Sequence, residues 1–485
     1  MNSIRVRRRR RRQARVGAPD ASLTANAGLA AVSELCGRLG VIEAIDAAAG
    51  PVKQRDRGFG AGGLLTGIAA AQLAGEDFLV GLDRQRADAA GQQIAPVPGL
   101  SSTTAAGLAR RITLAQWQAV EAGVASVTGR MMTLLEPERA AALTGGPVTI
   151  DLDTTDVEVY GRKKRGVAYN HQGQRVGRPH VATWAEAETV LAADLGDGTD
   201  DPRASAPCLL RRALASLPEQ ARRSGRVALR ADAGYFAGAL ARAAHDEHIS
   251  FAIGARRIAP LWRLLAGIAE DDWHDAIDMG GAQVAVADYC PDWWPASTSL
   301  LVRRVALDPA QVSADPRSRR RRTLHPDQRA LPFPELAKAD AIYAYSFILT
   351  NLDVSAPARA AAAEHWYRHR TTVENIFRDS KHGAALRHLP SGYPRVNMAW
   401  MWGALLAATM AGWLHQLTAV TAGEDILAGH GVRGGKAMIA TLRRRLIAVP
   451  GRLVRHGRQL ILRLPPGCHL LAEVLARLRA LPAMP

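Results

Sequence analysis

The sequence predicts an α/β protein in which a mixed sheet with flanking helices follows an N-terminal all-α domain and is interrupted by a β-rich insertion. Three observations support this fold class. Residues 20–143 repeat apolar residues every three or four positions, as amphipathic helices do. Residues 144–255 alternate short β-branched apolar runs with helical patterns. The chain, at 485 residues, is also long enough for two or three domains.

The N-terminal part divides into a basic tail and a helical domain. Residues 1–19 include RVRRRRRRQAR, and we expect a disordered tail because almost nothing in it can be buried. Such an arm is either a solvated charge run or a non-specific grip on phosphates. Residues 20–143 contain the helical patterns GLAAVSELCGRLGVIEAI, GLLTGIAAAQLAG and TAAGLARRI, and Ser101 or Ser102 is the expected N-cap of the last one.

The α/β part begins at VTIDLDT, which has the composition of a buried strand. Further strands are expected at HVATW, ETVLAADL, GRVALRADA and ISFAIGA, with helices at CLLRRALASL and FAGALARAAHDEH. Residues 256–340 are irregular, rich in Trp, Pro and Arg, and predict an insertion with β content. Together, the strand–helix alternation predicts a first core segment over 144–255 that is interrupted by this insertion.

Residues 341–415 resume the α/β pattern with the strand AYSFILTN and one long helix from about Ala358 to His382. The apolar run Met398–Leu414 is shorter than the ~20 residues of a membrane span, and we interpret it as a buried core helix. Residues 416–485 predict a helix, a short hairpin and a closing helix. We therefore expect no membrane association from these segments.

The composition narrows the class of partner. The net charge is +17 and the pI is about 10.5, which favours a polyanion, either nucleic acid or an anionic membrane surface. The four cysteines are far apart and form neither a zinc ribbon nor a disulfide framework. No apolar segment of a secretory signal follows the basic N-terminus. These features predict a protein of a reducing cytoplasm.

The segment AEHWYRHRTTVENIFRDSKHG concentrates reactive side chains. On one continuous helix, at about 100° per residue, four of them fall on a single narrow stripe, namely Tyr367, Arg370, Glu374 and Lys381. A carboxylate flanked by cations and a phenol would then lie along the edge of a buried face. The alternative is an ordinary amphipathic helix with an Arg370–Glu374 surface pair.

Two aspartates end predicted strands. Asp153 closes VTIDLD and Asp232 follows VALRA, at the strand ends where α/β sheets bind ligands. Each could instead be a turn or helix-cap residue. With Glu374 they would form a cluster of hard oxygen ligands suited to Mg²⁺ or Mn²⁺. Asp151 points to the same face of its strand as Asp153 and is an alternative ligand.

The chain resembles the bacterial insertion-sequence transposases that carry the Y-R-E-K signature, which it matches at Tyr367, Arg370, Glu374 and Lys381. It also resembles them in the triplet DTT at Asp153, in ADAGYF around Asp232 and in FILTN before the long helix. The resemblance covers most of residues 20 to 480. The chain is most similar to the insertion-sequence group numbered thirteen-eighty. These are DDE-type enzymes with an RNase H-like catalytic core.

The resemblance implies a role for each matched residue. Asp153, Asp232 and Glu374 would be the catalytic triad and would hold two Mg²⁺ ions, with Mn²⁺ as a substitute. Asp153 is preferred over Asp151 because the family triplet is D-T-T. The other signature residues, Tyr367, Arg370 and Lys381, would bind DNA at the transposon end. The helical domain would recognise the ends, and the β-rich insertion would occupy the gap before Glu374.

Two basic clusters lie outside this signature. The first comprises Arg162, Lys163, Lys164 and Arg165, just after the first strand; we favour phosphate contact over a solvated turn because it lies beside the predicted site. The second is RRRR at 319–322, for which a DNA contact and an exposed loop are equally open. The formal G-x-G-x-x-G at 58–63 lacks a preceding strand, and GVRGGKA has Ala437 where a P-loop needs Ser or Thr.

The sequence therefore predicts a DNA transposase that cleaves at transposon ends and transfers the 3′-OH into target DNA by a cut-and-paste route. Its partners would be double-stranded DNA, at the terminal inverted repeats and the target, and a second copy of the chain on that DNA. The expected location is the bacterial cytoplasm, associated with the nucleoid. The alternatives are a stand-alone metal-dependent nuclease and an inactive, transposase-derived DNA-binding regulator.

Overall fold

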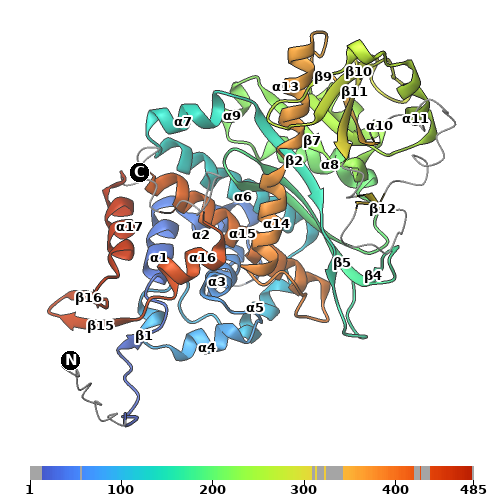
Figure 1. Ribbon diagram of the computed structural model, residues 1–485. Coiled ribbons are helices and arrows are strands. Elements are labelled where there is room, and N and C mark those ends of the chain that lie inside the picture. The colour runs from blue at the N-terminus through green and yellow to red at the C-terminus, as the bar shows by residue number, and fades with distance from the viewer. Residues whose placement is uncertain are drawn as a thin grey trace, which may run out of the picture.

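The structure is a computed structural model that describes residues 14–54, 57–307, 312–313, 322–323, 342–419, 427 and 437–482 (Figure 1). Three segments singled out in the sequence lie outside these residues, wholly or in most of their length. They are the arginine-rich part of the N-terminal tail, the run at 319–322 apart from the backbone of its last residue, and GVRGGKA apart from Ala437.

Residues 20–143 are helical, as predicted. The helices are α1 (Leu29–Leu39), α2 (Val41–Ala49), α3 (Ala61–Ala74), α4 (Gly81–Ala87), α5 (Ser102–Ala109), α6 (Leu114–Thr133) and α7 (Pro137–Thr144). The expected cap of α5 is Ser101, whose side chain accepts a hydrogen bond from the backbone N–H of Thr104. Thr113 and Gln116 form a capping box at α6. Local sequence therefore sets where these two helices begin.

The central sheet has the RNase H-like order. Its five core strands run β6 (Thr189–Asp197), β5 (Arg175–Trp184), β2 (Val148–Thr154), β7 (Val227–Ala231), β8 (Ser250–Ala255). β5 runs antiparallel to both of its neighbours, β6 and β2, and β7 and β8 run parallel to β2. The short strands β3 (Val157–Glu158) and β4 (Ala168–Tyr169) also pair with β5. The predicted fold class is confirmed.

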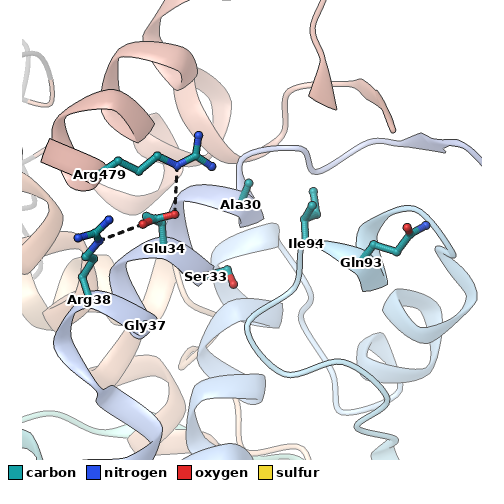
Figure 2. A pocket seen from close by; sticks show the side chains of 8 residues that line it. All are labelled: Ala30, Ser33, Glu34, Gly37, Arg38, Gln93, Ile94 and Arg479. Carbon is teal, nitrogen blue, oxygen red and sulfur yellow. Dashed lines mark hydrogen bonds and ion pairs between the residues drawn. The ribbon is translucent and has the colours of Figure 1, made fainter. Parts of the chain in front are cut away.

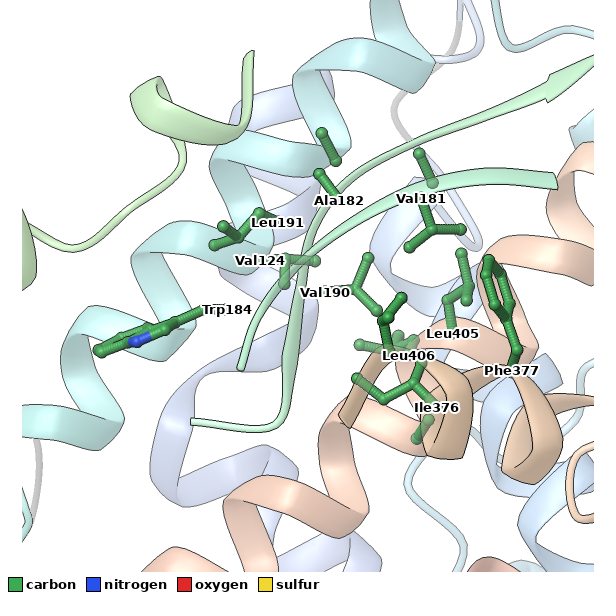
Figure 3. Close-up of a cluster of buried hydrophobic side chains, with 14 of the residues drawn as sticks. Val124, Val181, Ala182, Trp184, Val190, Leu191, Ile376, Phe377, Leu405 and Leu406 are labelled. Atoms are coloured by element: carbon green, nitrogen blue, oxygen red, sulfur yellow. The ribbon is translucent and has the colours of Figure 1, made fainter. Parts of the chain in front are cut away.

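Helices cover both faces of this sheet (Figure 1). One face carries α8 (Pro202–Ala215) and α10 (Gly238–Asp246). The short helix α9 (Glu219–Arg223) follows α8 along the chain. The other face carries α14 (Thr371–His382) and α15 (Pro394–Thr418). Figure 3 shows Ile376 and Phe377 of α14 packed with Leu405 of α15 against the strands, near Val181 and Val190. This apolar contact holds α14 over the end of β2.

The interval 256–340 extends the same sheet. Its strands β9 (His274–Asp275), β10 (Ala282–Ala287) and β11 (Ser299–Leu307) join β14 (Ile342–Thr350), which pairs antiparallel with β8. The same interval contains the short helix α11 (Ala259–Leu264) and the strands β12 (Val312–Ser313) and β13 (Arg322–Thr323), which pair with each other. The predicted β content is present, and β9, β10 and β11 continue the sheet of the core strands beyond β14.

The single helix predicted from Ala358 to His382 is wrong. The chain forms α13 (Pro357–Arg368) and α14, separated by His369 and Arg370, whose ψ angles are 42° and 20°. The two helices cover different strands, since α13 packs on β9, β10 and β11 while α14 packs on β2. Tyr367 and Glu374 therefore do not share one helical stripe.

The C-terminal part packs back onto the N-terminal helices. It comprises α16 (Ile439–Leu442), a π-helical turn at Arg443–Ile447, β15 (Gly451–His456), β16 (Gln459–Arg463) and α17 (His469–Ala480). The helix, hairpin and closing helix expected here are present. β15 also pairs with β1 (Leu23–Thr24), and α1 packs against α17. One hydrophobic core joins these helices to the sheet.

The apolar run Met398–Leu414 lies in the interior. It is part of α15, which packs on α3 and β6 and is buried along almost its whole length. Among the residues described above, no helix has the length and apolar character needed to cross a membrane.

Candidate active site

Asp153 lies at the carboxyl end of β2, with 18% of its side chain exposed. Its Oδ1 accepts a hydrogen bond of 2.8 Å from the backbone N–H of Thr154, and its Oδ2 is 3.8 Å from a guanidinium nitrogen of Arg370. Burial raises the pKa of Asp153 to about 6; Arg370 opposes the rise, and the charges of Asp232 and Glu374 add to it. Asp232 and Glu374 therefore both lie within electrostatic reach of Asp153.

Asp232 follows β7 and caps a single 3₁₀ turn. Its Oδ1 accepts a hydrogen bond of 2.8 Å from the backbone N–H of Gly234. Parallel pairing of β2 with β7 places it beside the end of β2. The side chain is only partly buried, so a helix-cap role and a ligand role are compatible.

Glu374 lies in the first turn of α14 and is exposed. In the part of the chain that the structure describes, no hydrogen bond or ion pair involves its carboxylate. The predicted alternative, an Arg370–Glu374 surface pair, is wrong, because Arg370 faces Asp153 instead. A carboxylate in the first turn is favoured by the helix dipole.

Arg370 occupies the N-cap position of α14, and its side chain is 11% exposed. Its Nη2 donates a hydrogen bond of 3.3 Å to the carbonyl oxygen of Leu152. Burial opposes its charge, but Asp153 and the hydroxyl of Tyr367 outweigh burial and raise the pKa of Arg370. A permanent cation is thus fixed at the end of β2.

Tyr367 and Lys381 are each the second-last residue of a helix, α13 and α14 respectively. The Tyr367 hydroxyl donates a hydrogen bond of 3.4 Å to the carbonyl oxygen of Ala231, in a space that exists because residue 254 is glycine. Lys381 Nζ donates a hydrogen bond of 2.9 Å to the carbonyl oxygen of Asp156. Burial lowers the pKa of Lys381, against the opposing effect of Asp156 and Asp153. Hydrogen bonds thus place Tyr367, Arg370 and Lys381 around the ends of β2 and β7.

Asp151 has a different environment from Asp153. It is fully buried, and its two oxygens accept hydrogen bonds of 2.7 and 2.8 Å from Arg230 of β7. Arg230 also donates a hydrogen bond to the carbonyl oxygen of Trp366. Arg230 was missed by the sequence reasoning, although a charged residue inside the apolar strand VALRA was a visible signal. The pair fixes α13 to the sheet.

Tyr235 is a second side chain that the sequence reasoning did not assign. It ends the turn capped by Asp232, is 1% exposed, and its hydroxyl has no hydrogen-bond partner among the described residues. Burial, followed by the charges of Asp153 and Asp232, raises its pKa well above the usual range. The motif ADAGYF was the available signal. This phenol keeps its proton beside the carboxylates.

The basic cluster after β3 divides into two kinds of side chain. Arg162, Lys163 and Arg165 are exposed. Lys164 is half-buried, its ammonium group donates to the carbonyl oxygen of Leu389, and burial lowers its pKa. Lys164 therefore holds the turn in place, whereas the side chains of the other three are accessible to solvent.

The donor set suits a hard cation in its chemistry. Carboxylates are the preferred ligands of Mg²⁺ and Mn²⁺, and Asp153 interacts with both other members of the triad. Within the described ranges, however, no three His, Cys, Asp or Glu side chains lie close enough to surround one ion. The exposed, unpaired side chain of Glu374 is the member that can reorient most readily.

One cavity lies next to the predicted site, and a second lies away from it. One of about 300 Å³ begins at Thr154, next to Asp153, and is also lined by Arg178 and His180. Another of about 590 Å³ lies between α1 and α17, where Glu34 pairs with Arg38 and Arg479 (Figure 2). The second cavity has none of the predicted site residues in its lining.

Comparison with known proteins identifies the family. Residues 6–313 and 335–483 match the family described as transposase DDE domain group 1. No curated protein sequence matches. Among solved structures, the chain is similar to the piggyBac transposase in its synaptic complex with hairpin DNA, at 10% sequence identity, a TM-score of 0.39, and coverage of 86% of this chain and 80% of that one. The family match spans nearly the whole sequence, and the chain belongs to the DDE transposase domain group 1 family.

Proposed function

We propose that this chain catalyses cut-and-paste transposition of an insertion sequence of the group numbered thirteen-eighty, with Asp153, Asp232 and Glu374 as the catalytic carboxylates. The observation that carries the proposal is the raised pKa of Asp153. Burial and the negative charges of Asp232 and Glu374 raise it, beside the guanidinium of Arg370 at the end of β2. Membership of a DDE transposase family supports the same reaction class.

Two divalent cations, Mg²⁺ or Mn²⁺, would be held by the three carboxylates of Asp153, Asp232 and Glu374. When bound, such a pair stabilises the attacking and the leaving oxygen of a displacement at phosphorus. The chain's own part is to present the carboxylates and to place cations for the phosphate. Arg370 is fixed by Leu152, and Lys381 keeps two of its three N–H donors after bonding Asp156.

The DNA would lie across the ends of β2 and β7. Arg370, Lys381 and the Tyr367 hydroxyl would contact the terminal phosphates and nucleotides, and the exposed side chains of Arg162, Lys163 and Arg165 would contact phosphates farther along. We assign Lys164 to holding that turn. Two ends must be held together before joining, so we propose a homodimer on DNA, in the bacterial cytoplasm and at the nucleoid.

The test compares Glu374→Gln with Glu138→Gln, since both residues are exposed glutamates in the first turn of a helix. Full-length protein is incubated with Mg²⁺ and DNA that carries the inverted repeats flanking the coding region. Wild type and Glu138→Gln should nick that DNA, whereas Glu374→Gln should bind it without cutting. Normal cleavage by Glu374→Gln would remove Glu374 from the mechanism.

The same assay separates the two rival functions. With pre-cut ends and a plasmid target, a transposase joins the 3′-OH to the plasmid, and a stand-alone nuclease leaves the ends unjoined. A DNA-binding regulator derived from a transposase would bind the ends, and wild type would neither cut nor join them.

A further inference from the structure

Three segments that are distant in the sequence meet at an exposed tyrosine. They are the end of α5 at Arg110–Arg111, the turn at 161–166, and the residues 392–395 that lead into α15. Tyr393, at their centre, is 44% exposed. The guanidinium carbon of Arg110 lies 3.8 Å from the centroid of its ring, and that of Arg165 lies 5.9 Å away. One aromatic ring thus holds two guanidinium groups from different parts of the chain. We call this the Tyr393 surface.

Backbone contacts fix the turn of this surface. The backbone N–H of Arg165 donates a hydrogen bond of 3.2 Å to the carbonyl oxygen of Gly392. Arg175 donates hydrogen bonds of 2.6 Å to the carbonyl oxygens of Gly161 and Lys164, and Arg395 donates one of 2.9 Å to that of Arg110. The backbone is therefore ordered before any ligand binds, which lowers the entropic cost of binding.

The surface is strongly positive. Five of its cations are exposed and form no ion pair with any acid in the described part of the chain: Arg110, Arg111, Arg162, Lys163 and Arg165. The acids nearby are already engaged, since Glu158 accepts a hydrogen bond of 2.9 Å from the Tyr160 hydroxyl and Asp77 pairs with Arg387 at 2.7 Å. Exposed rings and cations that are not neutralised suit a phosphate backbone.

The position of the surface relative to the carboxylates follows from the register of β5. Val181 lies opposite Asp153, and Arg175, which holds the turn, lies six residues along the same strand. At about 3.3 Å per residue, Arg175 is about 20 Å from Asp153 along β5, and duplex DNA that runs along this strand covers that distance in about six base pairs.

We propose that the Tyr393 surface binds the DNA duplex about six base pairs from the cleavage point, through the phosphates. The inference rests on the proposed function and adds a partner surface to which the N-terminal helical region contributes. The helical region and the catalytic core contact the same stretch of DNA as one body, because Arg110 and Arg165 are held on one ring.

The test measures binding of the full chain to a duplex with the terminal repeat and to an unrelated duplex, at increasing salt. The double variant Arg110→Ala/Arg165→Ala should lower the slope of log affinity against log salt by about two on both duplexes. Its affinity should then fall about tenfold less than that of wild type between about 50 and about 200 mM salt. Phosphate-interference footprinting should lose contacts about six base pairs from the cut.

Matched variants separate this surface from overall charge. Arg222→Ala/Arg458→Ala removes the same charge from exposed positions on α9 and the β15–β16 turn and should keep the wild-type slope. Tyr393→Phe should behave as wild type, and Tyr393→Ala should bind about two- to fivefold more weakly. The pair Arg162→Ala/Lys163→Ala tests the same surface at two exposed side chains that form no hydrogen bond or ion pair with the part of the chain that the structure describes.

The outcomes keep the two proposals apart. If wild type neither binds nor cuts the terminal duplex, the proposed function fails. If wild type binds and cuts while both double variants of the surface keep the wild-type slope, only this inference fails. An equal loss of slope in the α9 and β15–β16 control would also overturn it.

Discussion

Two aspartates on one strand, two residues apart, have opposite environments. Asp151 lies in the middle of the sheet, fully buried and paired through both oxygens with Arg230. Asp153 lies at the strand end, partly exposed, with one guanidinium nitrogen at 3.8 Å and two further carboxylates acting on it. The ion pair between Asp151 and Arg230 supports the fold. The negative charge of Asp153 is unfavourable in its surroundings, and a bound cation would stabilise it. The carboxylate proposed to bind metal is thus the one whose charge lacks a close ion-pair partner.

The largest effect is expected for the strand-end residue. Asp153→Asn should reduce Mg²⁺-dependent cleavage at least about a thousandfold, about 4 kcal/mol of transition-state free energy, because it removes one of the three proposed metal-binding carboxylates. The free energy of unfolding should not fall. Cleavage rates and urea denaturation measured on the same preparation check both statements. Cleavage within tenfold of wild type would remove the distinction between the two aspartates.

The second effect concerns folding. Asp151→Asn should lower the free energy of unfolding by about 3–5 kcal/mol, because Arg230 is left buried without its counter-charge. Urea denaturation measures this loss. The double variant Asp151→Asn/Arg230→Met should recover part of it, since no charge is then stranded. A loss below about 1 kcal/mol for the single variant would contradict the structural role.

The third effect is a pH dependence. In the folded chain Asp153 has a pKa of about 6, above its ordinary value of 3.8, so the folded state binds the proton more strongly between these pH values. The stability contributed by this group is therefore complete below pH 3.8 and is lost as the pH rises through about 6. The loss is of order 3 kcal/mol.

Thermal unfolding with a chelator present, compared between wild type and Asp153→Asn across this range, isolates the contribution of Asp153. Other buried acids such as Glu121 titrate in both proteins and cancel in the difference. If the difference in Tm between the two proteins stayed constant across this pH range, the carboxylate with the raised pKa would not be Asp153.

The smallest effect on the free energy of unfolding is expected for Glu374. Because its side chain is exposed and makes no described contact, Glu374→Gln should change the free energy of unfolding by no more than about 0.5 kcal/mol while abolishing cleavage. Chemical denaturation measures the difference. A loss above about 1 kcal/mol would give Glu374 a structural role and weaken its use as a clean active-site variant.

The elements that the sequence predicts correctly are those with local causes. The run VTIDLDT is apolar and β-branched, and it forms the buried strand β2. Ser101 has the side chain of an N-cap and caps α5. Asp153 lies at the end of β2 and Asp232 directly follows β7, so parallel pairing of the two strands brings both residues to the same edge of the sheet.

The features that the sequence does not predict depend on distant partners. Nothing between Tyr367 and Thr371 marks a helix end, since no Pro or Gly occurs there. The break arises because α13 and α14 cover different strands of one sheet. The Asp151–Arg230 pair likewise requires the register of β2 against β7, in which the two residues lie side by side. Pattern reasoning on a single segment contains neither fact.

The pairing of β1 with β15 has a consequence for synthesis of the chain. Leu23 pairs with Arg452, which the ribosome adds 429 residues later (452 − 23). At about 5–20 residues per second, that strand waits roughly 20–90 seconds for its partner. During this interval the apolar side of α1 lacks α17 as well. Nascent chains should therefore depend on chaperones until elongation is nearly complete, and slower translation should lengthen that dependence.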